Sequence, residues 1–91
     1  MWVQPREYKY VGDALAAARD RAGLTQAQLA RLLRKPQSFV SSYERGQRRI
    51  DVLELLRIVE ALRDDPRKVF IDIIELRAGA KPGKVKRRGS T

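Results

Sequence analysis

Apolar residues along this chain of 91 residues recur at intervals of three and four positions, the spacing of amphipathic α-helices. The pattern predicts an all-α fold. The expected helices span residues 11 or 12 to 21, 26–33, 36–45, 51–62 and 66–76. Residues 1–10 form an arm without a clear period, and residues 78–91 form a basic tail expected to be disordered on its own. The single predicted domain is therefore residues 11–77.

Several helix boundaries are marked by residues that satisfy free backbone groups. Thr25 with Gln28, and Asp51 with Glu54, have the spacing of a capping box, in which each side chain bonds the other residue's backbone N–H. Gly23 and Gly46 can each end a helix in the left-handed conformation. Asp65 followed by Pro66 can start one, with Asp65 as the cap and Pro66 as the first helical residue. These signals indicate short helices separated by tight connections.

The helix expected at residues 36–45 has two unlike faces. Pro36, Phe39, Val40 and Tyr43 fall on one side of a helical wheel. The opposite side carries short polar groups and one guanidinium, from Gln37, Ser38, Ser41, Ser42 and Arg45. Such groups let a helix approach the edges of DNA bases and form hydrogen bonds there. The alternative is a Ser-rich helix that merely faces solvent.

The formal net charge is +9, and its distribution favours a polyanionic partner. Residues 31–49 contain six basic residues against the single acid Glu44, so positive charge flanks the polar helix. We expect Arg48 or Arg49, just past that helix, to contact phosphates, although both could be ordinary solvated charges. A membrane surface is the weaker alternative, because no helix pairs a basic face with exposed Trp or Phe.

The composition argues against several classes of protein. The chain contains neither cysteine nor histidine, which removes disulfides, thiolate zinc sites and the commonest general base. We therefore expect no metal, no cofactor and no enzymatic activity. Apolar runs fall short of the roughly 20 residues that span a bilayer, and the N-terminus lacks the apolar core of a signal peptide. A cytoplasmic protein fits these observations.

The last two predicted helices are unusually apolar. The helix at 51–62 carries apolar residues around much of its circumference, which predicts a central position in the core. In the helix at 66–76, Val69, Phe70 and Ile73 can face the core, but three further residues cannot all point the same way. These are Ile71, Ile74 and Leu76. The surplus predicts a homodimer formed through this helix, and the alternative is a monomer core that uses every apolar residue.

Residues 11–62 resemble the Cro and phage-repressor-like helix-turn-helix family, also called XRE-like. The motifs that carry the resemblance are GLTQAQLA, PQSFVSSYERG and DVLELLRIVEAL. The resemblance implies a compact four- to five-helix lambda-repressor-like domain. It also implies a transcriptional regulator that binds double-stranded DNA in a sequence-specific manner, with the 36–45 helix in the major groove.

The resemblance also assigns roles to individual residues. Positions that reach base edges are matched by Gln37, Ser38 and Ser42, and positions near the DNA backbone are matched by Gln26, Ser41 and Arg45. Arg19 matches a basic residue that pairs with the acid at Glu44. Two positions depart from the family pattern, since Arg34 replaces the usual turn Gly and Lys35 replaces an apolar residue. Both add positive charge at the groove edge, where we expect backbone contacts, and a left-handed Arg34 would be strained.

A second hypothesis remains open at this point. Antitoxin-like and accessory proteins use the same scaffold as a protein-interaction module, and the apolar surplus of the 66–76 helix could serve such a partner. The basic tail could follow a phosphate backbone, reach a minor groove or simply increase solubility.

Overall fold

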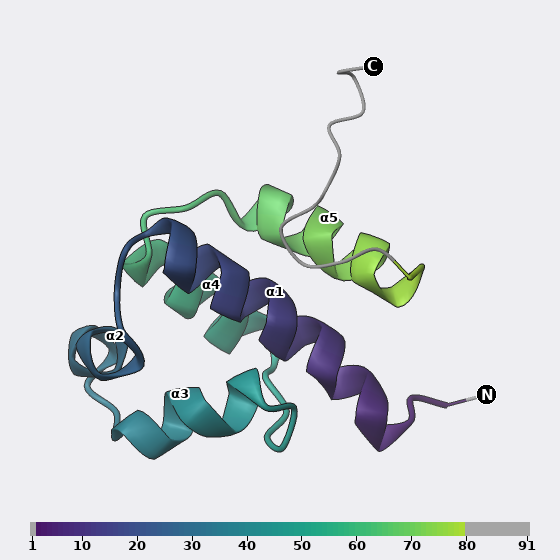
Figure 1. Ribbon diagram of the computed structural model, residues 1–91, viewed down its shortest axis with the longest axis horizontal. Coiled ribbons are helices and arrows are strands. Elements are labelled where there is room, and N and C mark those ends of the chain that lie inside the picture. Colours follow the sequence, from purple (N-terminus) through teal and green to yellow (C-terminus); the bar gives the residue numbers. More distant parts are fainter. Residues whose placement is uncertain (1, 80–91) are drawn as a thin grey trace.

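The computed structural model describes residues 2–79, which form five α-helices preceded by a 3-10 turn. The elements are η1 (Pro5–Glu7), α1 (Tyr8–Arg21), α2 (Gln26–Leu33), α3 (Gln37–Glu44), α4 (Val52–Ala61) and α5 (Pro66–Arg77). Helix α1 packs against α3 on one side and α5 on the other, while α2 contacts both α3 and α4 (Figure 1). The fold is the predicted lambda-repressor-like arrangement of helices.

The cap residues set the helix starts where the sequence predicts them. Thr25 Oγ1 accepts the Gln28 N–H at 3.0 Å, and Asp51 Oδ1 accepts the Glu54 N–H at 2.8 Å. Asp65 accepts the Arg67 N–H at 3.0 Å and so caps α5. Each bond satisfies one N–H that would otherwise lack a partner at a helix start.

Two predicted starts need correction. Helix α1 begins at Tyr8, before the predicted Val11 or Gly12, because η1 leads directly into it. Helix α3 begins at Gln37, with Pro36 as its extended N-cap residue rather than its first helical residue. Residues 80–91 of the predicted tail lie outside the described part of the chain.

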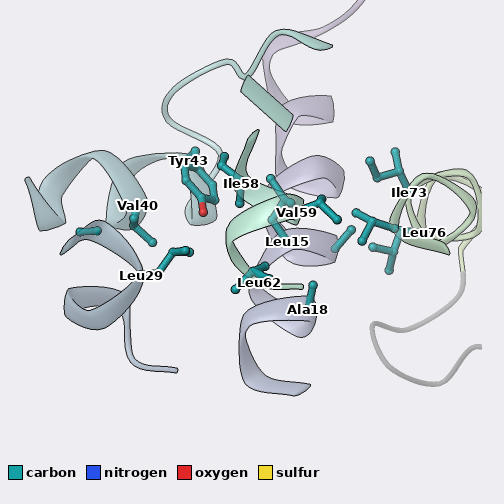
Figure 2. Packing of buried hydrophobic residues seen from close by; sticks show 13 residues of the cluster. Leu15, Ala18, Leu29, Val40, Tyr43, Ile58, Val59, Leu62, Ile73 and Leu76 are labelled. Carbon is teal, nitrogen blue, oxygen red and sulfur yellow. The ribbon is translucent and has the colours of Figure 1, made fainter. Parts of the chain in front are cut away.

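One core is formed by side chains from all five α-helices (Figure 2). Its largest fully buried members are Leu15, Leu29, Val40, Tyr43, Ile58, Val59 and Val69. Because α3 contributes both Val40 and Tyr43, the helix is anchored by its apolar face. The predicted aromatic side of this helix therefore lies inside, and its polar side is left at the surface.

Helix α4 is not packed as centrally as its composition predicts. Val52 and Leu53 are 73% and 75% exposed, respectively. The buried apolar residues are Ile58, Val59 and, just past the helix, Leu62. The first turn of α4 projects beyond the core, so its apolar residues remain at the surface.

Helix α5 is rotated relative to the prediction. Phe70, which was expected to face the core, is 58% exposed, whereas Leu76 is buried. The inward stripe consists of Val69, Asp72, Ile73 and Leu76. Asp72, Ile73 and Leu76 follow Val69 by three, four and seven residues, so the four side chains share one helix face. An acid therefore occupies the inward position that the apolar pattern gave to Phe70.

Arg21 is the partner that allows Asp72 to face inward. Its guanidinium lies 3.7 Å from the Asp72 carboxylate and 3.0 Å from that of Asp64, which precedes α5. Burial raises the pKa of Asp72 even though Arg21 opposes the shift. The two contacts tie the end of α1 to the start and middle of α5. The observed orientation of α5 buries Val69, Ile73 and Leu76, and the ion pair gives the inward carboxylate a partner.

Gly12 is the residue that brings α1 against α3. A Cβ at this position would overlap the carbonyl oxygen of Tyr43 and lie 2.7 Å from that of Glu44. The two backbones are therefore in direct contact at the end of α3. Glycine within a helix costs roughly 0.5–1 kcal/mol relative to alanine, and here that cost is offset by the close packing.

Replacing Gly12 with alanine should therefore destabilise the protein, although helix propensity alone favours alanine. We expect Gly12→Ala to reduce the free energy of unfolding by about 2 kcal/mol, a typical loss when a methyl group is forced into a packed site. Urea titration followed by circular dichroism measures this change. Ala17→Gly in the same helix is the control and should lose about 0.5–1 kcal/mol. A Gly12→Ala variant as stable as the parent would contradict the contact.

Candidate nucleic-acid interface

The turn between α2 and α3 is built on a left-handed Arg34. Its φ and ψ are 59° and 43°, in the region that glycine usually occupies. The Lys35 N–H bonds the Ala30 carbonyl at 3.0 Å, which closes the end of α2. Pro36 is extended with ψ of 155°, so the chain changes direction before α3. Arg34 therefore adopts the backbone conformation that glycine favours, at some steric cost.

The polar face of α3 lies at the molecular surface. Gln37 and Ser38 are exposed, while Ser41 and Ser42 are half-exposed. The Ser42 hydroxyl donates to the Ser38 carbonyl at 2.6 Å, which leaves its oxygen lone pairs available as acceptors. Arg45 contacts the Ser41 hydroxyl with one guanidinium nitrogen. The arrangement presents an amide and three hydroxyls side by side.

Behind this face lies a buried ion pair between α1 and α3. The Glu44 side chain is 7% exposed, and it accepts bonds from Arg19 Nε at 2.7 Å and Arg19 Nη2 at 3.0 Å. The hydrogen bond to Glu44 is the main cause that raises the pKa of Arg19. Arg19 also donates to the Leu24 carbonyl at 2.9 Å. The structure thus brings together the two residues that were expected to pair.

Gln26 connects this ion pair to the exposed face. Its amide nitrogen donates to Glu44 Oε1 at 2.8 Å, and its amide oxygen accepts from Gln37 Nε2 at 3.3 Å. The amide carries two N–H groups, so the second one remains for a ligand. Gln26 and Gln37 are therefore oriented by a chain of contacts that begins at the buried carboxylate.

Aromatic rings hold several of the candidate phosphate-binding cations. Lys35 Nζ lies 5.5 Å from the centre of the Phe39 ring, and the Arg48 guanidinium lies 4.8 Å from it. Arg49 lies over Tyr8 at 5.5 Å. These distances are within the range of cation–π attraction. The cations flanking α3 are thus positioned on the side chains of two aromatic residues.

Sequence reasoning missed several members of this site. Glu54 was assigned only to a cap, yet its second carboxylate oxygen lies 3.1 Å from Arg48 Nη2. Gln47 also accepts from Arg45, at 3.3 Å from Nε and 3.2 Å from Nη2. The contact of Lys35 with Phe39 could not be read from helical spacing, because Lys35 lies in the turn before α3 and not on a helix. Tyr8 and Arg49 lie far apart in the chain, so their contact left no local pattern either.

Within residues 2–79, no group of three acidic side chains is placed to hold a metal ion. Among the same residues, no helix is both long and apolar enough to cross a membrane.

Comparisons with known proteins find domains with a similar sequence and fold. A helix-turn-helix family model matches residues 15–64. The clp gene regulator ClgR from Corynebacterium glutamicum has a similar structure, with a TM-score of 0.76 and 26% identity, covering 81% of this chain and 96% of that chain. A search of curated proteins finds no match.

Two further solved structures show higher sequence identity. The restriction-modification controller protein C.AhdI from Aeromonas hydrophila is 34% identical with a TM-score of 0.65, covering 71% of this chain and 98% of that chain. An XRE-family like protein from Pseudomonas syringae pv. tomato is 37% identical with a TM-score of 0.67, covering 78% of this chain and 87% of that chain.

Removing one partner of the buried ion pair should destabilise the fold strongly. We expect Arg19→Met to reduce the free energy of unfolding by about 3 kcal/mol, because Glu44 would keep a buried charge without its main partner. Arg19→Lys is the matched comparison and should lose less, since it retains the charge with fewer donors. Chemical denaturation measures both changes. Equal stability of Arg19→Met and the parent protein would contradict this role.

Proposed function

The chain belongs to the XRE-type helix-turn-helix family, and from that premise we propose that this DNA-binding transcriptional regulator acts as a homodimer on a two-fold related site. The observation that carries the DNA-binding part of this proposal is the division of α3 into a buried apolar face and an exposed face of amide and hydroxyl groups. In the major groove, such a face can bond base edges directly.

Three residues of α3 are proposed to read bases. Gln37 can bond an adenine through both its amide oxygen and nitrogen, the usual pairing for this side chain. Ser38 is exposed beside it. Ser42 would act as an acceptor for a base amino group, because its hydrogen is already donated to the Ser38 carbonyl.

Contacts with the DNA backbone would supply most of the affinity. The free N–H of Gln26 can bond a phosphate while its other contacts hold it in place. The remaining candidates surround α3, and they are Arg34, Lys35, Ser41, Arg45, Arg48 and Arg49. Each cation that neutralises a phosphate releases condensed counterions, so affinity should fall steeply with salt.

The proposed dimer interface lies on the side formed by α4 and α5. A groove of about 680 Å³ runs between these helices, lined by Val52, Leu56, Phe70 and Ile71 among other residues. These four side chains are all exposed in the single chain. A second copy covering this face would bury Phe70 and Ile71 of α5 and place two α3 helices on one duplex. For a site with half-sites one turn apart, their spacing would be roughly 34 Å.

A different protein on the same face is the alternative, in which the chain serves as an antitoxin-like or accessory module. The apolar lining of the groove would accept either occupant. A monomer that co-purifies with another chain would favour this alternative over the homodimer.

Selection of bound duplexes from a random pool should return a palindromic sequence. With the Gln37→Ala variant, the same selection should lose its base preference at one base pair in each half-site. Loss of one good base contact corresponds to roughly 1–3 kcal/mol of discrimination. Lys35→Ala is the control, since loss of a phosphate contact should weaken binding to every sequence alike. Equal weakening of all duplexes by Gln37→Ala would remove this residue from base recognition.

Phe70→Glu should convert the dimer into a monomer, because it places a charge in the apolar groove. Sedimentation velocity measures the oligomeric state. The variant's affinity for DNA with two half-sites should fall more than its affinity for DNA with one half-site. Leu53→Glu is the control for the sedimentation measurement, since Leu53 is also exposed on α4, at 75% against 58% for Phe70, but lines a different depression. If Phe70→Glu leaves the sedimentation unchanged, the interface lies elsewhere.

A further inference from the structure

Glu54 uses its two carboxylate oxygens for two different purposes. Oε1 accepts the Asp51 N–H at 3.0 Å, which completes the capping box of α4. Oε2 accepts from Arg48 Nη2 at 3.1 Å. A cap needs only the first of these contacts, and glutamine can provide it as well. The negative charge of Glu54 is therefore available for a separate role toward Arg48.

Arg48 is held on three sides in the free protein. Besides the Glu54 carboxylate, it contacts the Phe39 ring at 4.8 Å and donates from Nη1 to the Arg49 carbonyl at 3.1 Å. Its side chain is 41% exposed and that of Glu54 is 32% exposed, so water and ligands still reach the pair. The guanidinium has five N–H donors, and those not used here can bind another anion.

We propose that Glu54 competes with the DNA backbone for Arg48 and thereby limits the affinity of the protein for DNA of any sequence. The inference rests on the proposed function. A phosphate that approaches Arg48 must either displace the Glu54 carboxylate or share the guanidinium with it. Displacement breaks the Arg48–Glu54 ion pair, and sharing brings two negative groups close together, so either outcome weakens the contact with phosphate.

Competition by Glu54 for Arg48 weakens the part of the binding free energy that does not depend on the DNA sequence. Non-specific affinity arises almost entirely from cations at phosphates, so reducing the effective charge of Arg48 lowers it directly. Base contacts from α3 do not involve Glu54. Arg48 itself remains oriented on Phe39, which preserves the geometry of the contact while its strength is reduced.

Glu54→Gln tests the proposal, because glutamine keeps the cap oxygen and removes the charge. We expect binding to a non-specific duplex at about 0.1 M salt to tighten several-fold. The salt dependence should steepen by up to about 0.9 in the slope of log K against log salt, the change for one additional phosphate contact. Fluorescence anisotropy over a series of salt concentrations measures both quantities. Thermal melting should show a folded protein.

Glu60→Gln is the matched control. Glu60 lies on the same helix and pairs with Arg57 at 3.7 Å, with both side chains 77% exposed. This variant changes the net charge by the same amount, but it does not release Arg48. Its effect on binding should be clearly smaller than that of Glu54→Gln.

A double-mutant cycle completes the test. In an Arg48→Ala background, Glu54→Gln should have no larger effect than Glu60→Gln, because the cation for which it competes is absent. The inference is overturned if the two glutamine variants tighten binding equally, or if the effect of Glu54→Gln persists without Arg48. If the parent protein binds no duplex at all, the proposed function fails first and this inference fails with it.

Discussion

A buried carboxylate requires hydrogen-bond donors, and the donors to Glu44 of α3 come from two other helices. It stands at the end of α3, receives the guanidinium of Arg19 from α1 and receives the amide of Gln26 from α2. Because each partner must be in place to compensate the charge, the relative positions of these helices are coupled. The exposed amide of Gln37 is connected to the same group through Gln26. The surface that faces a ligand is therefore oriented by a polar contact inside the protein.

The remaining surface is divided between two kinds of interaction. Cations and hydroxyls gather around the turn and α3, whereas exposed apolar side chains gather on α4 and α5. Helix α4 contributes to both regions, since its first turn carries Val52 toward the groove and Glu54 toward Arg48. The proposed dimer and the proposed DNA contacts would therefore influence each other through one short helix, although the residues proposed for each do not overlap.

Local signals in the sequence were sufficient to predict much of this fold. Capping residues such as Thr25 and Asp51 act within a few positions, so their effect can be read from spacing alone. The division of α3 into two faces follows from the helical period. The orientation of α5 could not be predicted in this way, because Phe70, Ile71 and Ile74 compete with Val69, Ile73 and Leu76 for the inward face. The partner of the inward Asp72 is Arg21, which is distant in the chain and leaves no local signal. The second role of Glu54 was hidden for the same reason, since the cap already explained that residue.

The contact at Gly12 brings the main chain of α1 against the main chain of α3, with no side chain between them at that point. Backbone atoms therefore set the distance between α1 and α3 at this crossing, and a change of side chains on the exposed face of α3 does not alter them. The same scaffold can then carry a different set of outward residues on α3 and acquire a new target without being rebuilt. Gly12 thus helps to fix the position of α3 independently of the side chains that α3 presents outward.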